Sequence, residues 1–333
     1  MHLHFKSNHP FKSFEEQLSI LEERGLAIDD YKLALDAMES FSYYTIVNGY
    51  KDLFLDPKYQ NRGIERFKKG TTFSMLYQAH WIDLSMSSLL FKYTLAVEKK
   101  LKTQVSYLIG EKLSIEESLY LDKKFYGQNK ANRGKLFQLK EKINEAKEKD
   151  ISAKYYWEKE HNVPPWIAAK AISFGSIVTW YSLLTEYHKN CIIDGFKFNT
   201  KGLKQQERLR FFNNSINQVY DYRNLTAHGN RTFCLNLQTS QKILHLKTVG
   251  KDVLIKDKLG THNNDLFSVV FTILSLLTDN YVATNMIVEL KQFFSQYDSL
   301  NLAFLDKDIF GLFNFPRDFD ERLETAFKQR FES

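Results

Sequence analysis

Residues 73–109 read FSMLYQAHWIDLSMSSLLFKYTLAVEKKLKTQVSYLI and contain neither proline nor glycine. These two residues most often interrupt helices, so a strongly apolar stretch of this length without them predicts one long helix. The whole chain of 333 residues has only 14 glycines and five prolines. Because Leu, Lys, Glu and Gln are also abundant, the sequence predicts a mainly α fold.

The first helix of the chain is marked at both ends. Ser13 and Glu16 have the spacing of a capping box, in which each side chain accepts a hydrogen bond from the other residue's backbone N–H. Gly25 suits the left-handed conformation that ends many helices. A second helix is predicted from about residue 29 to residue 50.

Breaks in the helical pattern divide the chain into three predicted parts. Pro57 and Gly63 separate the first helices from the long apolar segment, and Pro316 marks a turn before the last helix. The predicted parts are an N-terminal helical lobe over residues 1–62, a main helical domain over 63–297, and a C-terminal turn with a short helix over 298–333.

Two further long helices are predicted inside the main domain. One begins at Pro165 and includes Gly175, where a missing side chain indicates close backbone packing. The other covers residues 263–297. Residues 232–260, by contrast, lose the helical period and gain β-branched residues, which predicts a small β-hairpin or an irregular excursion.

The helix before this excursion carries an anomaly. Its apolar residues recur at intervals of three or four residues and form a stripe along one face. Arg223 occupies the next position of this stripe. The apolar positions are Leu209, Phe212, Ile216 and Val219. A guanidinium on such a stripe needs a paired group or an anionic ligand, because an unpaired buried charge is costly.

His228 follows Arg223 near the predicted end of this helix, since Gly229 suits the position after a C-terminus. On an ideal helix the two residues lie about 140° apart and do not share a face. Either the last turn unwinds, or the same residues of a second copy complete the site. A histidine that exchanges a proton and an arginine that holds a phosphate suffice in principle for RNA cleavage. In the plainer alternative, His228 caps the helix and Arg223 pairs with a carboxylate.

Several common catalytic and metal-binding signals are absent. The sequence has no GxxxxGK[ST], HExxH, GxSxG or GxGxxG motif. His2, His4 and His9 lie in a terminal segment without defined geometry, and Cys191 and Cys234 lack CxxC spacing. We therefore predict no metal and no cofactor.

The expected location is the cytoplasm. The N-terminus lacks the apolar core of a signal peptide, and the longest apolar runs are too short to span a bilayer. Two isolated cysteines fit a reducing compartment. We expect a soluble protein without a membrane partner.

Positive charge is concentrated in two windows of a chain whose formal charge is +6. Residues 123–160 hold eleven basic and six acidic side chains, and residues 197–231 hold seven basic and two acidic ones. Both windows would attract an anionic partner. The first is equally compatible with a solvated, charged helix surface.

Glu98 lies at the edge of an apolar stripe in the long helix. Lys99, Lys100 and Lys102 follow it directly. Its position alone predicts an ion pair on the helix surface.

The segment YRNLTAHGNR resembles the Arg-x4-6-His motif of HEPN ribonucleases, including a polar residue directly after the arginine. Three further segments are similar, in the same order, to those of the AbiD/AbiF-like, or Abi-2, abortive-infection family. They are SFEEQLSILEERGLAIDDYKLALDAMESFSYYTIVNGY, PPWIAAKAISFGSIVTWYSLL and FGLFNFP. The resemblance covers nearly the whole chain. It implies a HEPN-type helical bundle and a role in bacterial anti-phage defence with toxin–antitoxin behaviour.

This resemblance implies roles for four residues. Arg223 and His228 match the family's catalytic pair, and Asn224 matches the polar position. Glu98 falls where HEPN proteins often have an acidic residue that points toward the motif. HEPN sites usually form where two motifs meet across a dimer, which implies a homodimer. The polar YDY before the motif and the long excursion over residues 232–260 depart from the family pattern.

The leading hypothesis is a metal-independent, homodimeric endoribonuclease in which His228 and Arg223 assist attack by the RNA 2′-hydroxyl. The side chains expected to bind RNA are Lys204, Arg208, Arg210 and Arg231. A second hypothesis is a non-cleaving regulator that grips a small structured RNA, which would act as an antitoxin or regulator. A third is a helical scaffold that binds another protein. Only phosphate contacts would make RNA affinity fall steeply with salt.

Overall fold

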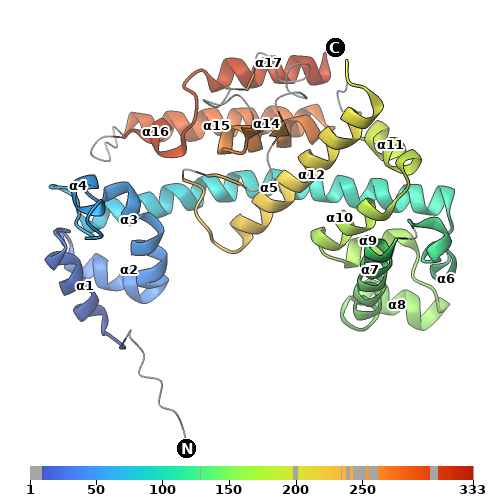
Figure 1. Cartoon of the computed structure of the whole chain (residues 1–333), viewed down its shortest axis with the longest axis horizontal. Helices are drawn as coiled ribbons and strands as arrows, with labels where there is room; N and C mark the ends of the chain where they lie inside the picture. Colours follow the sequence, from blue (N-terminus) through green and yellow to red (C-terminus); the bar gives the residue numbers. More distant parts are fainter. Residues whose placement is uncertain are drawn as a thin grey trace, which may run out of the picture.

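The fold is mainly α, as predicted, and it is built around one central helix, α5 (Phe73–Lys112) (Figure 1). The computed structural model describes residues 10–127, 129–197, 202–233, 235–237, 241–242, 253–254, 262–300 and 307–332. His2, His4, His9 and Cys234 lie outside these ranges. No helix in the described ranges combines the length and apolarity needed to cross a bilayer.

The long helix predicted from the absence of breakers is confirmed. α5 has 40 residues and is therefore about 60 Å long. Thr72 caps its start, since the Thr72 hydroxyl accepts a hydrogen bond from the Met75 N–H at 3.3 Å. Other helices pack against it along its whole length, so apolar residues are buried from Leu76 near its start to Ile109 near its end.

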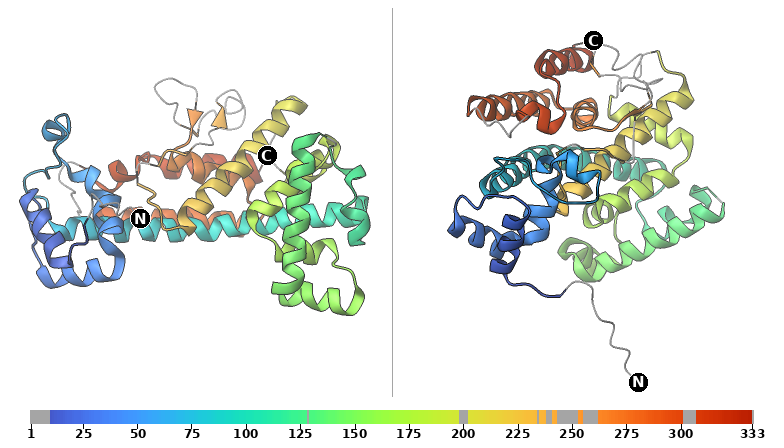
Figure 2. Two further views of the ribbon diagram at one scale, coloured as in Figure 1. Left: turned by 60° about the horizontal axis from the view of Figure 1, so that its bottom comes forward. Right: turned by 60° about the vertical axis from the view of Figure 1, so that its left-hand side comes forward.

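The N-terminal helices pack at the first end of α5 (Figure 2). They are α1 (Phe14–Glu23), α2 (Tyr31–Tyr43), the π-helix η1 (Tyr44–Asn48), α3 (Gly49–Phe54) and α4 (Pro57–Gln60). The capping box of Ser13 and Glu16 is confirmed. The single helix predicted over 29–50 is wrong, because Ser42 has a φ of 67° and the chain then forms a π-helix. Neither proline nor glycine marks this break, so local sequence does not reveal it.

A second group of helices surrounds the other end of α5 (Figure 2). It comprises α6 (Glu117–Tyr120), the 3-10 helix η2 (Lys123–Phe125), α7 (Lys130–Lys149), α8 (Ile151–Glu160), α9 (Pro165–Ala171), α10 (Phe174–Leu183) and α11 (Glu186–Gly195). Its core includes Trp180, which stacks on Tyr120 and donates a hydrogen bond to the Tyr126 hydroxyl at 3.0 Å. The basic window 123–160 thus forms mainly the α7–α8 pair.

The single helix predicted from Pro165 is divided into α9 and α10. The break lies at Ser173, whose hydroxyl accepts a hydrogen bond from the Ser176 N–H and so caps the start of α10. The close packing predicted at Gly175 is confirmed. A Cβ at this position would lie 2.8 Å from the Tyr220 hydroxyl oxygen, so α10 packs closely against the Tyr220 side chain of α12.

The remaining helices lie along one side of α5, and α12 crosses it near the middle (Figure 1). They are α12 (Gln205–Ala227), α14 (Leu266–Leu276), α15 (Asn280–Ser299), α16 (Ile309–Phe313) and α17 (Phe319–Phe331). The single helix predicted over 263–297 is wrong. Leu277 is extended and Asp279 caps the start of α15.

A two-stranded antiparallel sheet lies where the hairpin or irregular excursion was predicted. β1 (Gln241–Lys242) pairs with β2 (His262–Asn263), with Gln241 opposite Asn263 and Lys242 opposite His262. β2 falls just beyond the predicted boundary at residue 260. Most of the chain between the two strands lies outside the described residues.

The buried carboxylate of Asp83 holds the chain that follows α12 against α5. It accepts hydrogen bonds from the backbone N–H groups of Thr232 and Phe233 at 2.9 and 3.0 Å, and from the Tyr50 hydroxyl at 3.0 Å. Burial raises the pKa of Asp83 to about 6. One side chain therefore joins α5, the N-terminal helices and the segment after α12.

We expect Asp83→Ala to lower the free energy of unfolding by roughly 3 kcal/mol, because three buried donors lose their acceptor. Asp83→Asn keeps one acceptor oxygen and should cost less. Chemical denaturation of both variants, followed by circular dichroism, measures the difference. Equal losses in the two variants would contradict the proposed role of the acceptor oxygens.

The same residue predicts a pH dependence. Folding raises the pKa of Asp83 from 3.8 to about 6, so the folded state binds the proton more tightly. This stabilisation is complete below pH 3.8 and is lost as pH rises through about 6. Between pH 4 and 7 the stability of wild type relative to Asp83→Asn should therefore fall by about 2 kcal/mol. A difference that does not change with pH would show that the carboxyl does not titrate in this way.

Candidate functional site

α12 has the apolar stripe that the sequence predicts. All four predicted apolar positions are buried: Leu209, Phe212, Ile216 and Val219. The side chain of Arg223, the next position, keeps 28% of its area exposed. The guanidinium thus lies at the boundary between the interior and solvent.

α12 ends as predicted, at His228 and Gly229. Gly229 has a φ of 68°, its N–H donates to the Thr226 carbonyl, and the Asn230 N–H donates to the Leu225 carbonyl. This pair of bonds is the Schellman arrangement, which closes a helix without disturbing its last turn.

The last turn of α12 does not unwind. The His228 N–H still donates to the Asn224 carbonyl at 3.1 Å, and the helix continues through Ala227. Of the two alternatives for bringing Arg223 and His228 together, the structure excludes unwinding within the described chain. His228 is exposed at the helix end, and within one chain it lies on a different face from Arg223.

Glu98 of α5 faces Arg223. One carboxylate oxygen, Oε2, lies 3.5 Å from the Arg223 Nε, and the other, Oε1, lies 3.1 Å from the Lys102 Nζ. The i,i+4 ion pair with Lys102 agrees with the sequence prediction, but its expected surface position is wrong, because Glu98 is only 8% exposed. α12 packs against α5, and Arg223 brings this contact to the Glu98 carboxylate.

Two further groups contact the guanidinium of Arg223. Its Nη1 donates to the Asn224 Oδ1 at 3.4 Å, and its Cζ lies 5.7 Å from the centre of the Phe91 ring. A carboxylate, an amide and an aromatic face therefore orient one cation. Three of the four predicted catalytic residues, Arg223, Asn224 and Glu98, are thus brought together, whereas His228 is not.

The four predicted RNA-binding residues do not form one group with Arg223. Arg231 donates to the Gly49 carbonyl at 2.7 Å and lies 3.7 Å from Asp52, so it ties the end of the motif to α3. The other three lie at the opposite end of α12, about 20 Å or more from Arg223 along the helix axis. These are Lys204, Arg208 and Arg210. Arg208 is paired with Asp194, whereas Lys204 and Arg210 are exposed.

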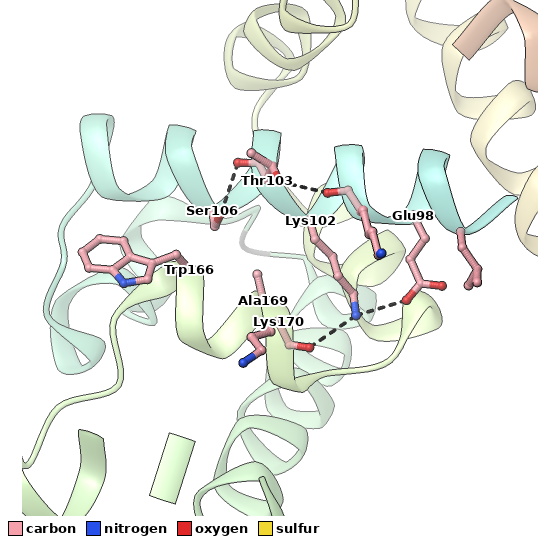
Figure 3. A pocket seen from close by; sticks show the side chains of 9 residues that line it. Glu98, Lys102, Thr103, Ser106, Trp166, Ala169 and Lys170 are labelled. Carbon is pink, nitrogen blue, oxygen red and sulfur yellow. Dashed lines mark hydrogen bonds and ion pairs between the residues drawn. The ribbon is translucent and has the colours of Figure 1, made fainter. Parts of the chain in front are cut away.

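A pocket of about 490 Å³ opens between α5 and α9, with Glu98 at one end (Figure 3). Its remaining lining residues are Leu95, Lys99, Lys102, Thr103, Ser106, Trp166, Ala169 and Lys170. Lys102 joins the two helices, since its Nζ donates to the Ile172 carbonyl at 2.7 Å while it pairs with Glu98. Sequence reasoning missed this pocket because its two walls are separated by some sixty residues, which only tertiary packing brings together.

No cluster of three His, Cys, Asp or Glu side chains with the arrangement of a metal site occurs among the residues that the structure describes. Arg223 contacts the Glu98 carboxylate and the Asn224 amide, and Lys102 pairs with the same carboxylate. Such a set can bind and orient an anion, because the cations outnumber the single carboxylate.

Comparison with known proteins finds one family. The family model described as "Abi-like protein" matches residues 36–234, more than half of the chain. The matched part contains Glu98, the pocket between α5 and α9, and Arg223 with His228. No curated protein and no solved structure matches the chain.

We expect Glu98→Ala to lower the free energy of unfolding by roughly 2–3 kcal/mol, because two partly buried cations lose their shared carboxylate. Glu98→Gln keeps the shape of the side chain and should lose less. Glu145→Ala is the matched control, since it breaks an exposed helical pair with Lys142 and should cost under about 1 kcal/mol. Similar melting temperatures for Glu98→Ala and Glu145→Ala would contradict the shared-carboxylate interpretation.

Proposed function

This chain belongs to the Abi-like family, which associates it with abortive-infection defence, and from this premise we propose that it is a metal-independent endoribonuclease of the AbiD/AbiF-like, HEPN type. The proposed substrate is RNA, and cleavage would stop growth of an infected cell. The observation that carries the proposal is the orientation of Arg223 by Glu98 and Asn224 on the helix that ends at the exposed His228.

In the proposed reaction, His228 accepts the proton of an RNA 2′-hydroxyl. The 2′-oxygen then attacks the neighbouring phosphorus, and the bond from phosphorus to the 5′-oxygen breaks. The protonated His228 then gives this proton to the leaving 5′-oxygen, so the products are a 2′,3′-cyclic phosphate and a 5′-hydroxyl. Arg223 stabilises the negative charge that grows on the non-bridging phosphate oxygens.

We further propose that two copies of the chain form the site. Arg223 and His228 lie on different faces of an intact helix end, so a single copy does not aim both at one phosphate. A two-fold arrangement would bring the arginine of one copy beside the histidine of the other. The exposure of His228 supports this arrangement, because the imidazole remains accessible to a partner.

A non-cleaving RNA-binding regulator is the second candidate. The observation that favours it is the pairing of Arg223 with Glu98, because a guanidinium already facing a carboxylate is less available for a phosphate in the transition state. In that case the exposed Lys204 and Arg210 would contact a structured RNA without any cleavage.

Incubation of the purified protein with total RNA in EDTA tests the nuclease. We expect His228→Asn to slow cleavage by roughly 10²–10⁴-fold, because asparagine cannot exchange the proton. Arg223→Gln should slow it by about 10²–10³-fold. The products should carry 2′,3′-cyclic phosphates.

Two substitutions are matched controls for this experiment. His161 also caps a helix C-terminus, that of α8, and His161→Asn should leave cleavage unchanged. Arg317 is an exposed, paired arginine, so Arg317→Gln should also have no effect. If wild type and His228→Asn degrade RNA equally, the assigned site is wrong; if wild type binds RNA but never cleaves it, the regulator is favoured.

Mixing inactive variants tests whether two copies share the site. Arg223→Gln and His228→Asn chains, co-expressed and purified together, should recover about a quarter of wild-type cleavage, since half of the dimers are mixed and each has one intact composite site. Either variant alone should remain inactive. No recovery in a preparation proven to contain mixed dimers would contradict a site built from one arginine and one histidine of different copies.

A further inference from the structure

We propose that the pocket between α5 and α9 binds one nucleotide of a single-stranded RNA, with the base on Trp166 and phosphates beside Lys99 and Lys170. This inference rests on the proposed function only in taking RNA as the substrate. It adds a binding subsite to the region near Arg223, with residues that neither the motif nor the family match assigns.

The pocket extends along one face of α5. Glu98, Lys102 and Ser106 follow each other at intervals of four residues and therefore line the same face. Trp166 lies beside Gly110, where a Cβ would come within 3.7 Å of its ring. The rise of the helix from Glu98 to Gly110 is about 18 Å, which gives room for one nucleotide and its flanking phosphates.

Trp166 provides an aromatic surface at the far end of this face (Figure 3). Its side chain is 48% exposed, although indole rings normally gain free energy from burial. Pro164 and Pro165 precede it and restrict the backbone at the start of α9. The backbone that carries the ring is therefore restricted, and the ring keeps the accessible surface that a base-stacking platform requires.

The cations of the pocket exceed its anions. Lys102 is occupied by Glu98 and the Ile172 carbonyl, but Lys170 bonds only to the neutral hydroxyl of Ser152, and Lys99 is exposed. Within the described part of the chain, no carboxylate pairs with Lys99 or Lys170. Two positive charges thus remain available for phosphates along the same groove.

Two hydroxyl groups between these lysines and Trp166 have free acceptor capacity. The Thr103 hydroxyl donates to the Lys99 carbonyl at 3.0 Å, and the Ser106 hydroxyl donates to the Thr103 carbonyl at 3.1 Å. Each hydroxyl oxygen has therefore used its proton but can still accept a hydrogen bond. Donors on a nucleotide include the ribose 2′-hydroxyl, which distinguishes RNA from DNA.

The position of Glu98 favours an RNA strand over a free nucleotide as the occupant. One of its oxygens lies toward Lys102 in the pocket, and the other faces Arg223. A strand whose base rests on Trp166 would continue along the lysines toward Arg223. A free nucleotide would use only the far end of this surface.

Fluorescence anisotropy with a short, labelled, single-stranded RNA of mixed sequence tests this assignment. All proteins carry His228→Asn so that the RNA stays intact. We expect Trp166→Ala to weaken binding by roughly 5- to 100-fold, because base stacking is lost. Trp166→Phe should retain most of the affinity, and it also guards against misfolding of the alanine variant.

The double variant Lys99→Ala with Lys170→Ala should weaken binding and reduce its dependence on salt, by about one unit of slope for each lysine. Trp157→Ala and Lys58→Ala are the controls. Trp157 is 40% exposed on α8, and Lys58 is exposed on α4, both outside the pocket. Neither should change the affinity.

Unchanged RNA affinity in Trp166→Ala would overturn the proposal. Equal affinity of the wild-type protein for AMP and for the RNA would also overturn it, because the rest of the strand would then contribute nothing to binding. DNA of the same sequence should bind more weakly. If wild type cleaves RNA but Trp166→Ala does not change binding, the nuclease proposal holds and this subsite is wrong. If binding depends on Trp166 but wild type never cleaves RNA, the subsite holds and the nuclease proposal is wrong.

Discussion

α5 passes through the whole molecule, so a polar side chain on its buried faces has protein rather than water around it and needs a partner. Asp83 and Glu98 meet this constraint in different ways. Asp83 accepts hydrogen bonds from backbone N–H groups of the segment after α12 and from the hydroxyl of Tyr50. Glu98 forms ion pairs with two cations, Lys102 of its own helix and Arg223 of α12. The two carboxylates thereby position both ends of the chain segment that contains His228.

The contact between Glu98 and Arg223 also sets the chemistry available near the motif. Their closest atoms lie 3.5 Å apart, and neither of these two atoms has a hydrogen-bond partner among the described residues. The pair is therefore electrostatic, and it orients the guanidinium without using its full bonding capacity. An anionic phosphate would compete with the Glu98 carboxylate for Arg223. If Arg223 turned toward the phosphate, Lys102 would still partly neutralise the charge of Glu98.

Much of the helical structure could be predicted because its signals are local. The capping box at Ser13, the unbroken run into α5 and the glycine after His228 each act through neighbours within a few residues. The breaks at Ser42 and Ser173 were missed for the opposite reason. Neither residue is a strong helix breaker, and in each case the helix that follows the break packs against α5.

The candidate site likewise has features that local sequence predicts and features that depend on tertiary contacts. The stripe spacing identified Arg223 as anomalous, the helix geometry showed that His228 lies on another face, and the family resemblance indicated Glu98. The sequence by itself determined the mainly α class, the end of α12 and the need of Arg223 for a partner, because periodicity and capping are local. Only the tertiary structure decided that Glu98 is this partner, that Arg231 binds α3 and that Trp166 lies beside α5, because these contacts join residues far apart in the chain.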